Sequence, residues 1–339
     1  MTAPAPLTVG VLYPGELGAA LAGALVARGV PVVTTAHGRS GRTAARAADC
    51  GAVVLNSPPE VVRASDVLFS LVVPSAAEVV ANEYLQSARL APRGAIYVDA
   101  NSIGPDKVRA IAERIESAGV SFVDASINGL AKNLCTTATL YLAGRRAGEV
   151  AALCDQVARV KLLGEEVGRA SAMKMLLGGL SKGVCALFAE LSVLAHEQGM
   201  LDDLLEAATR TYPGVTALAE RMLPTYTQHA ARRATEMSEL EATARAAGVT
   251  PRAIEGVVKF HEALAAEMDE QPNPLSPVLR GEGRGEGPLP EHHAGSGNGK
   301  SPSPHPSPLS TGERGQGAAP DLSSTVKFLA AQLTQPEVV

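Results

Sequence analysis

The sequence predicts an N-terminal α/β domain with a mostly parallel sheet, followed by an all-α C-terminal domain. Short β-rich runs alternate with helical stretches in the first half, which is typical of strand–helix–strand units. Strand signals end near Gly164, and helical periodicity then continues from Val167 to about Met268. A chain of 339 residues also favours two domains over one. We therefore expect one domain at residues 1–163 and a second at 164–339.

The predicted strands are apolar along their whole length, as expected for a sheet that helices cover on both faces. They are Leu7–Leu12, Pro31–Thr35, Ala52–Leu55, Val67–Val73, Ala95–Asp99, Ser121–Asp124 and Thr136–Leu142. The helical patterns between them include Leu17–Arg28, Gly41–Asp49 and Pro105–Ala118. From Glu165 to Gln198 the pattern fits one long helix, which Gly199 ends and which connects the two domains.

Residues 271–320 interrupt the helical domain. They are rich in Pro, Gly and Ser and have almost no large apolar side chains, so they cannot bury enough surface to offset their chain entropy. We predict a disordered low-complexity insertion here, in which the His292–His293 pair is solvated and binds no metal. The helical pattern resumes at Leu322–Leu333, an amphipathic helix that we expect to dock on the helical domain.

Charge, apolar runs and cysteine spacing argue against a nucleic-acid partner, a membrane span, a signal peptide and a metal site. The net charge is −5, and no run of Lys or Arg indicates a nucleic-acid surface. Lys174 and Lys182 interrupt the longest apolar run, Met173–Leu194, which therefore predicts a buried helix instead of a membrane span. Met1–Leu7 lacks the positive charge of a signal peptide. The four cysteines have no metal-ligand spacing, so we expect free thiols, no metal and a cytoplasmic location.

A glycine-rich turn, VGVLYPGELG from Val9 to Gly18, follows the first strand. Backbone N–H groups at a helix start attract a pyrophosphate, and this turn heads the alternating strand–helix pattern. We therefore favour a Rossmann-type dinucleotide-binding domain over a turn without a ligand. The second and third glycines of the GxGxxG pattern are present as Gly15 and Gly18. The carboxylate of Glu16 should point away from the phosphates. The predicted cofactor-binding residues are Tyr13, Pro14, Gly15, Glu16, Leu17 and Gly18.

The residues after the second predicted strand favour NADP over NAD. An NAD enzyme usually has Asp or Glu there to bind the ribose 2′-hydroxyl, and residues 34–42 contain no acid. Arg39, Ser40 and Arg42 offer guanidinium and hydroxyl donors that suit a 2′-phosphate. In the alternative interpretation, the arginines are solvated residues at a helix start, and NAD is then the cofactor.

Five blocks of the sequence resemble, in order and spacing, the β-hydroxyacid dehydrogenase superfamily, which includes 6-phosphogluconate and 3-hydroxyisobutyrate dehydrogenases. The first is the cofactor loop just described, and Asp66–Pro74 resembles the strand and loop beside the nicotinamide. Asp99–Pro105 resembles the motif D-x-S-T-x-x-P, and Asp124–Gly129 resembles D-A-P-V-S-G. Gly168–Gly178 resembles G-x(5)-K-x(3)-N. The match covers roughly residues 7–200, and the order of the blocks is more specific than any one block.

The resemblance implies roles for individual residues. Lys174 stands at the position of the family's catalytic lysine, and Val73 and Pro74 would lie beside the nicotinamide with Asn101. The substrate-binding positions that it implies are Asn101, Ser102, Asn128, Gly129, Gly178 and Lys182. Without the resemblance, the two asparagines could serve as turn or cap residues. The lysine could equally extend its ammonium to solvent, or be partly buried with a lowered pKa that suits acid/base catalysis.

Several positions depart from the family's pattern. Asn101 and Asn128 stand where the family has serines, and Leu130 and Gly178 replace a glycine and an asparagine. Tyr13 replaces the first glycine of the cofactor loop. Most departures lie where the substrate would be held. They indicate a divergent branch, with a phosphogluconate dehydrogenase-like C-terminal domain, whose substrate the sequence does not identify.

The sequence thus predicts an NAD(P)-dependent oxidoreductase that transfers hydride between nicotinamide and a small hydroxy acid or a related carbonyl compound. Lys174 would be its general acid/base. The alternatives are an imine reductase on the same fold and a non-catalytic dinucleotide-binding protein. The expected partners are a small-molecule substrate and a second copy of the chain, bound through the helical domain. Neither nucleic acid nor a membrane is expected.

Overall fold

The computed structural model describes residues 7–270 and 321–333, which form two compact units. The first contains residues 7–182 and 235–255, and the second contains residues 183–234, 256–270 and 321–333. The change from strands to helices occurs close to the predicted domain boundary at residue 163, whereas the two units divide further on, inside the long connecting helix. The predicted insertion at 271–320 lies outside the described residues.

The first unit contains an eight-stranded sheet in the order β3-β2-β1-β4-β5-β6-β7-β8. Strands β1 to β6 are parallel, β7 is antiparallel to β6, and β8 is parallel to β7. This confirms the predicted α/β class with a mostly parallel sheet. The strands are β1 Val9–Leu12, β2 Val32–Thr35, β3 Val53–Val54, β4 Val67–Ser70, β5 Ile96–Asp99, β6 Ser121–Asn128, β7 Thr139–Ala143 and β8 Arg159–Leu162.

Several strands differ from the prediction. Strand β4 ends at Ser70 instead of Val73, and β7 begins at Thr139 instead of Thr136. Strand β6 continues from Asp124, where we expected it to end, to Asn128, because residues 124–128 pair with β7. The prediction missed β8 altogether, since its Arg-Val-Lys-Leu sequence is largely exposed at the sheet edge and shows no apolar run.

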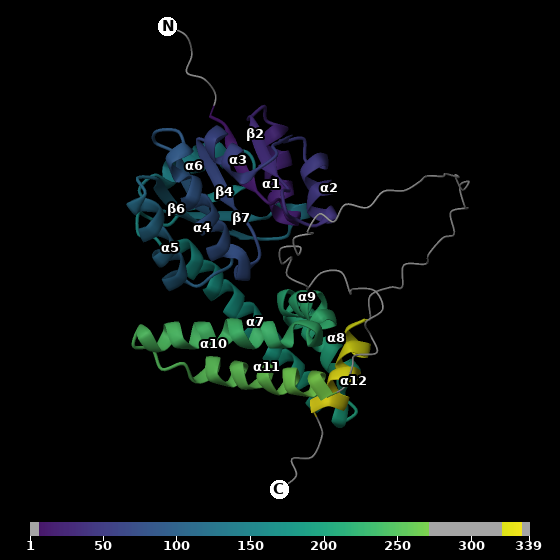
Figure 1. Cartoon of the computed structure of the whole chain (residues 1–339). Helices are drawn as coiled ribbons and strands as arrows, with labels where there is room; N and C mark the ends of the chain where they lie inside the picture. Colours follow the sequence, from purple (N-terminus) through teal and green to yellow (C-terminus); the bar gives the residue numbers. More distant parts are fainter. Residues whose placement is uncertain (1–6, 271–320, 334–339) are drawn as a thin grey trace, which may run out of the picture. The chain divides into compact units, whose positions relative to one another are not determined.

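Helices alternate with the strands of the first unit (Figure 1). They are α1 Glu16–Val26, α2 Gly41–Asp49, α3 Pro58–Ala64, η1 Pro74–Ala76, α4 Ala77–Ser87, η2 Ala88–Leu90, α5 Pro105–Ser117, η3 Ala131–Asn133 and α6 Ala147–Cys154. The remaining helices are α7 Arg169–Glu197, α8 Leu201–Thr211, α9 Pro213–Met222, η4 Leu223–Thr225, η5 Thr227–His229, α10 Ala230–Ala246, α11 Arg252–Glu270 and α12 Leu322–Leu333. Within residues 169–270 and 321–333, the sheet is thus followed by helices alone, as the sequence predicts.

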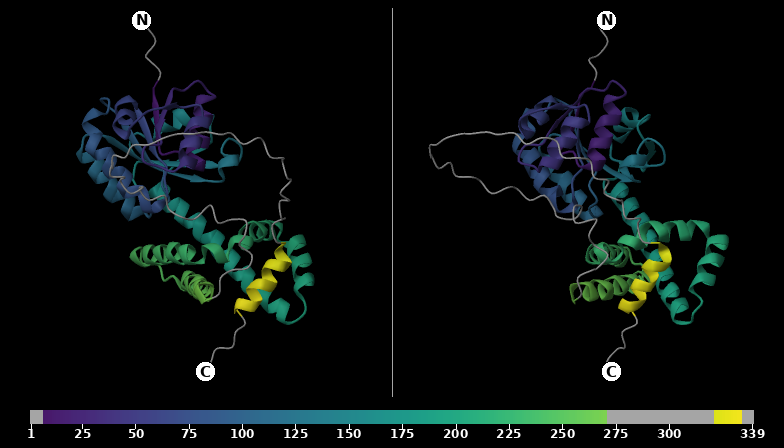
Figure 2. Two further views of the ribbon diagram at one scale, coloured as in Figure 1. Left: turned by 45° about the vertical axis from the view of Figure 1, so that its right-hand side comes forward. Right: turned by 90° about the vertical axis from the view of Figure 1, so that its right-hand side faces the viewer.

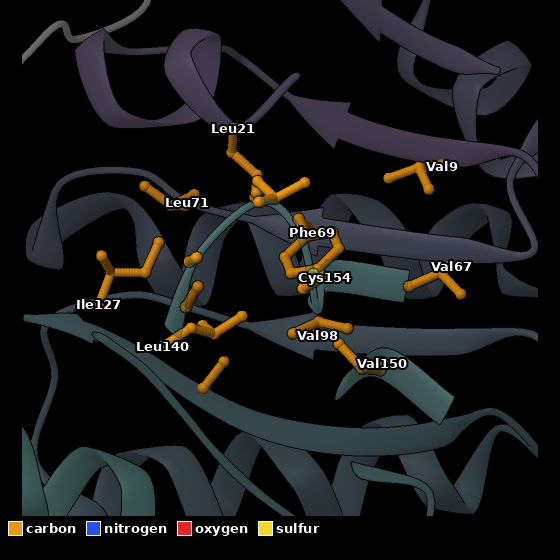
Figure 3. Close-up of a cluster of buried hydrophobic side chains, with 14 of the residues drawn as sticks. Val9, Leu21, Val67, Phe69, Leu71, Val98, Ile127, Leu140, Val150 and Cys154 are labelled. Atoms are coloured by element: carbon orange, nitrogen blue, oxygen red, sulfur yellow. The ribbon is translucent and has the colours of Figure 1, made fainter. Parts of the chain in front are cut away.

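Each face of the sheet has its own apolar core. On one face, side chains of β1, β4 and β5 such as Val9, Phe69 and Val98 pack against α1 and α6, and Figure 3 shows this cluster with Leu21 and Val150. On the other face, β-strand side chains pack against α3, α4 and α5. Because both faces are covered, strands β1, β2, β4 and β5 are buried along their whole length.

The second unit has a helical core of its own. It combines side chains from the second half of α7 and from α8, α9, η4 and α11. Helix α12, drawn in yellow in Figure 2, contributes Val326, Leu329 and Ala330 to this core, each at most 2 % exposed. The predicted helix at Leu322–Leu333 therefore docks on the helical part of the chain, as expected.

A buried polar cluster lies inside the second unit. The Nε2 atom of His261 is 3.1 Å from the Tyr226 hydroxyl, and its Nδ1 atom is 2.8 Å from the Val257 carbonyl. The Arg233 guanidinium lies 4.3 Å from the centre of the Tyr226 ring and donates to the Tyr226 carbonyl oxygen. These contacts satisfy the polar groups of fully buried side chains and join α10 and α11 to the η4–η5 segment.

Helix α7 runs through both units. Among the described residues it is the one helix that is long and apolar enough to cross a membrane by length and composition. A helix at the core of a fold passes the same test, and the second half of α7 packs in the core of the second unit.

Candidate functional site

The turn after β1 leads directly into α1. Tyr13 has a φ of 55°, a left-handed conformation that costs a non-glycine residue roughly 1–2 kcal/mol. Gly15 is the N-cap of α1, and a Cβ placed there would meet nothing within 4 Å. A Cβ at Gly18 would lie 3.4 Å from Val11 Cγ1, so α1 packs closely on β1. Open space at Gly15 and close packing at Gly18 fit a loop that admits a pyrophosphate at the helix start.

A pocket of about 580 Å³ opens beside this turn, at the ends of β1, β2 and β4. Its lining combines the glycine turn, the start of α2 and the segment after β4. The lining residues are Tyr13, Gly15, Glu16, Leu17, Arg39, Ser40, Arg42, Thr43, Arg46, Leu71, Val72, Val73 and Ala76. This volume falls within the range of small-molecule and cofactor pockets, roughly 300–1,000 Å³.

The start of α2 forms the polar wall of the pocket. Ser40 caps the helix, because its Oγ accepts a hydrogen bond of 3.3 Å from the Thr43 N–H. The positive end of the helix dipole and three arginine side chains, Arg39, Arg42 and Arg46, therefore meet in one pocket. Such a donor set suits a phosphate group.

Tyr13 connects Arg39 to a carboxylate on α4. The Tyr13 hydroxyl donates a hydrogen bond of 2.7 Å to Glu83 Oε2, and the Arg39 guanidinium lies 3.7 Å from the centre of the tyrosine ring. The Arg39 and Glu83 charges are also 3.7 Å apart, measured from Nη2 to Oε1. Burial, followed by the contact with Glu83, raises the pKa of Tyr13 to about 12, so its hydroxyl stays protonated near neutral pH.

Asn101 lies buried between the ends of β4 and β5. Its Oδ1 accepts a hydrogen bond of 2.7 Å from the Val72 N–H, and its Nδ2 donates one of 3.1 Å to Ser70 Oγ. Its own N–H donates to Asp99 Oδ1 at 3.0 Å. Asn101 therefore fixes the loop that carries Val72 and Val73 along the pocket, and only 1 % of its surface is exposed.

Asp99 is fully buried next to this loop, and its Oδ2 has no hydrogen-bond partner among the described residues. Burial raises the pKa of Asp99 to about 7, although the hydrogen bonds with Asn101 oppose the shift. The carboxyl group thus titrates near neutral pH behind the pocket.

The start of α7 is fixed to strand β6 by a single buried carboxylate. Asp124 Oδ2 accepts hydrogen bonds from the N–H groups of Gly168, Ala170 and Ser171, at 2.9, 2.8 and 3.2 Å. Its Oδ1 accepts from the Ser171 hydroxyl at 2.7 Å. Burial raises the pKa of Asp124, and these four hydrogen bonds oppose the shift. Lys174 follows one turn later, so its position depends on this cap.

Lys174 is half-buried on α7. Burial lowers the pKa of its ammonium group, and the nearby Glu236 carboxylate partly offsets that effect. Glu236 also forms an ion pair of 2.8 Å with Lys182, whose side chain is only 12 % exposed. The Lys182 Nζ atom would lie 3.2 Å from a Cβ at Gly178. The three predicted positions on α7 therefore lie along one helix segment, with Glu236 next to two of them.

Helix α7 packs closely on α10 in this region. A Cβ at Gly179 would collide with Leu240 Cδ2, so the glycine lets the two helices approach. The Lys107 ammonium lies 2.9 Å from Glu239 Oε1, which links α5 to α10, and Met175 lies beside Gly104 at the start of α5. We call residues 169–182 and 235–246 together the α7–α10 contact.

The remaining predicted residues differ in exposure and in whether they line the pocket. Val73 is exposed and lines the pocket, whereas Pro74 is exposed at the start of η1 and Ser102 is exposed after β5. Asn128 ends β6, and Gly129 follows with a φ of 144°, where a Cβ would collide with Ala138. Of the cofactor loop, Pro14 and Gly18 are buried and do not line the pocket.

Several pocket residues were absent from the prediction. They are Thr43, Arg46, Leu71, Val72 and Ala76, together with Glu83, which contacts Tyr13 from outside the lining. Arg46 could have been found from its helical spacing, four residues after Arg42. Glu83 had no such signal, because 70 residues separate it from Tyr13. No group of His, Cys, Asp or Glu that could hold a metal occurs in the described part of the chain.

Two family models match the chain. Residues 8–155 match the NAD binding domain of 6-phosphogluconate dehydrogenase, and residues 195–264 match a domain of unknown function, DUF1932. The first match includes the whole pocket. The region that contains the pocket is therefore a nicotinamide-dinucleotide-binding domain of the Rossmann type.

The chain is also similar to individual proteins. A solved conserved protein of unknown function, described as structurally similar to 3-hydroxyacid dehydrogenases, is 34 % identical; the match covers 76 % of this chain and 96 % of that one, with a TM-score of 0.62. An uncharacterized protein from Methanothermus fervidus is 29 % identical over 62 % of this chain and 81 % of its own.

More distant structures share the fold. A 3-hydroxyisobutyrate dehydrogenase from Mycobacterium tuberculosis, solved with L-serine, is 20 % identical, and the match covers 77 % of this chain and 94 % of that one, with a TM-score of 0.64. An imine reductase from Myxococcus stipitatus, solved with NAD+, is 18 % identical over 77 % of this chain and 94 % of its own, with a TM-score of 0.54.

Proposed function

Because the chain belongs to the β-hydroxyacid dehydrogenase superfamily, we propose that it transfers hydride between NADP and a small hydroxy acid or a related carbonyl compound, with Lys174 as the general acid/base. The chain contains a nicotinamide-dinucleotide-binding domain of an oxidoreductase family. The hydride transfer, the substrate, the choice of NADP and the role of the lysine are the proposal. The observation that carries it is the half-buried Lys174, with its lowered pKa, on a helix whose start is fixed by Asp124.

Lys174 would move the proton of the reacting hydroxyl. A bound nicotinamide supplies the hydride acceptor or donor. Removal of hydride from an alcohol carbon is unfavourable unless the hydroxyl proton leaves as the carbonyl forms. An amine whose pKa is lowered by burial can accept this proton closer to neutral pH, and it can return the proton in the reverse reaction. Asp124 keeps the amine in place through the α7 cap.

The pocket supports NADP as the cofactor. The glycine turn and the open space at Gly15 suit the pyrophosphate, and Arg39, Ser40 and Arg42 suit the 2′-phosphate of the adenosine ribose. No acid lines the pocket on α2, where a ribose 2′-hydroxyl would need one. With this cofactor in place, Val73, Pro74 and Asn101 would border the nicotinamide side.

The substrate would carry negative charge. Lys182 brings a cationic group, paired with Glu236, to the segment of α7 that carries Lys174, which suits the carboxylate of a hydroxy acid. Ser102, Asn128, Gly129 and Gly178 would complete the substrate site, as the family resemblance implies. The substitutions at several of these positions favour a substrate that differs from those of the named dehydrogenases.

Two alternatives predict different behaviour. An imine reductase would reduce C=N compounds with NADPH, and the shared fold supports this possibility. A non-catalytic protein would bind the dinucleotide without turnover, and the altered substrate positions support that interpretation. The presence of a half-buried lysine on α7 favours the hydroxy-acid enzyme over both.

We also propose a cytoplasmic homodimer with neither nucleic acid nor a membrane as partner. Apolar side chains remain exposed along α7, namely Leu176 and Leu180 in its first half and Leu187, Leu191 and Leu194 in its second half. A second copy of the chain would cover such surface. Sedimentation equilibrium would reveal a monomer if this proposal is wrong.

The test of function combines binding and turnover. Dissociation constants for NADPH and NADH are measured by fluorescence, and a panel of hydroxy acids, oxo acids and imines is screened by nicotinamide absorbance. Tighter NADPH binding and turnover of a hydroxy acid support the proposal. Turnover of imines alone would identify the reductase, and tight cofactor binding without turnover of any compound would indicate the non-catalytic protein.

A further inference from the structure

The Arg39 guanidinium lies next to two side chains, the Tyr13 ring and the Glu83 carboxylate. The Tyr13 ring supports the guanidinium from one side at 3.7 Å, and the Glu83 carboxylate on α4 approaches it at 3.7 Å. The Arg39 side chain is only 13 % exposed, so these contacts define where its donors point. A phosphate that enters the pocket at Arg39 would therefore meet a guanidinium that already lies within ion-pair distance of Glu83.

The Glu83 carboxylate makes its short contact with Tyr13 and not with Arg39. The hydrogen bond from the Tyr13 hydroxyl to Oε2 is 2.7 Å long, whereas the closest Arg39 nitrogen is 3.7 Å from Oε1, beyond hydrogen-bond distance. The raised pKa of Tyr13, about 12, keeps the proton that this hydrogen bond needs. Tyr13 holds this position despite its left-handed backbone, which glycine would adopt more easily.

We propose that Tyr13 is a specificity-determining positioning residue, which keeps Arg39 available to the 2′-phosphate of NADPH. Its ring supports the guanidinium, and its hydroxyl holds the Glu83 carboxylate, which would otherwise form a full hydrogen-bonded ion pair with Arg39. The inference rests on the proposed NADP preference and adds the residues behind it. Neither Tyr13 nor Glu83 needs to touch the phosphate itself.

The reason is the geometry of arginine–carboxylate pairs. A carboxylate free to turn toward a guanidinium forms two parallel hydrogen bonds with it, the same bidentate arrangement that a phosphate needs. A carboxylate already bound to a phenol has less freedom to do so. The tyrosine hydroxyl therefore decides whether Arg39 binds Glu83 or the cofactor.

The central test is the Tyr13→Phe variant, which keeps the ring and removes the hydroxyl. The ratio of the NADH and NADPH dissociation constants measures discrimination, and we expect it to fall about tenfold, which corresponds to about 1.4 kcal/mol. NADH binding should change little, because NADH has no 2′-phosphate. A merely structural role for Tyr13 would instead weaken both cofactors equally.

The second arm is a rescue. Glu83→Gln removes the competing charge, so Tyr13→Phe combined with Glu83→Gln should recover the discrimination of the native protein. Glu83→Gln alone should keep or increase it. Glu78→Gln is the matched control, since it removes one acid from the same helix, where Glu78 faces Arg114. That control should leave discrimination unchanged.

A pair of fragments isolates the phosphate. Adenosine 2′,5′-bisphosphate and adenosine 5′-monophosphate differ only in the 2′-phosphate, and their affinities should change as those of NADPH and NADH do. Melting temperatures of all variants check that they fold. The proposal is overturned if Tyr13→Phe keeps full discrimination, if Glu83→Gln alone lowers it, or if the double variant shows no recovery. If the native protein prefers NADH, both this proposal and the proposed cofactor fail, whereas an unchanged Tyr13→Phe ratio in an NADPH-preferring protein overturns this proposal alone.

Discussion

The cofactor pocket and the α7–α10 contact belong to the same compact unit but are built in different ways. The residues that line the pocket come from three short segments, 13–17, 39–46 and 71–76, and each segment follows one of three strands that are neighbours in the sheet. The α7–α10 contact joins two helices, and Asp124 of β6 fixes the start of α7, so the residues that meet are far apart in the sequence. The order of the strands in the sheet determines where the pocket forms. The packing of the two helices depends on individual side chains.

We expect the two regions to have separate functions, which substitutions can test. If the pocket holds the cofactor and the α7–α10 contact handles the substrate proton, changes in one region should leave the function of the other intact. The four changes below run from the largest expected effect to the smallest.

Lys174→Ala should lower turnover by about 10²–10⁴-fold, the usual contribution of a positioned general acid/base. NADPH affinity should stay nearly unchanged, because the lysine acts on the substrate. Lys182→Ala is the control on the same helix and should cost much less turnover. Single-turnover and fluorescence measurements separate the two effects. Full turnover of Lys174→Ala on the best substrate would show that the assigned role is wrong.

Asp124→Ala should lower the free energy of unfolding by about 3 kcal/mol. It leaves the buried N–H groups of Gly168, Ala170 and Ser171 without their acceptor. Asp106→Ala is the control, because Asp106 is an exposed acid in the first turn of α5, and its removal should cost at most about 0.5 kcal/mol. Urea unfolding measures both. Equal stability of the two variants would contradict the role of the cap.

Arg39→Ala should weaken NADPH binding by roughly 1–3 kcal/mol and leave NADH binding unchanged, because the charge-assisted contact is with the 2′-phosphate. Arg63→Ala removes an exposed arginine from α3 and serves as the control for overall charge. Fluorescence titration gives all the dissociation constants. An equal loss for both cofactors would mean that Arg39 does not distinguish them.

Asp99→Asn should change the pH dependence of stability. The pKa of Asp99 is about 7 in the folded protein and close to 3.8 when unfolded, so its contribution to stability is complete below pH 3.8 and is lost as the pH rises to about 7. The asparagine does not ionise, and the variant should gain stability relative to the native protein across this window. The gain should be only about 1 kcal/mol, because the new amide N–H groups are buried where Oδ2 has no partner.

Melting temperatures at pH 4 and at pH 8 measure this effect. The difference between variant and native protein should be larger at pH 8. A constant difference at both values would show that the pKa of Asp99 is not raised in the folded state.

The sequence predicted the fold well, because alternating apolar runs and helices constrain a parallel sheet strongly. It predicted the connecting helix and the docking helix near the end of the chain. It missed β8, whose exposed Arg and Lys give no strand signal, and it ended β6 early at the buried Asp124. A buried carboxylate in a strand is rare, and only the tertiary contact with α7 explains it.

The candidate site was predictable to a different extent in each region. Tyr13, Gly15 and Arg39 lie at positions that motifs mark, and the structure groups them around one pocket. Glu83 lies next to Arg39. Asp124 fixes the helix that carries Lys174, and Glu236 partly offsets the lowering of the Lys174 pKa. No local sequence pattern identifies the partners of these three acids. Asn101 carries a motif position, but its amide is engaged by Val72 and Ser70, which only the structure reveals.

The packing of α12 has a consequence for the order in which the chain is made. Its residues Val326, Leu329 and Ala330 complete the core of the second unit, although α11 ends at Glu270. At about 5–20 residues per second, a ribosome needs several seconds to pass from one helix to the other. During that interval the nascent second unit lacks part of its core and exposes apolar side chains. Chains released before Leu322 should therefore depend on chaperones or aggregate, whereas the sheet of the first unit is already complete.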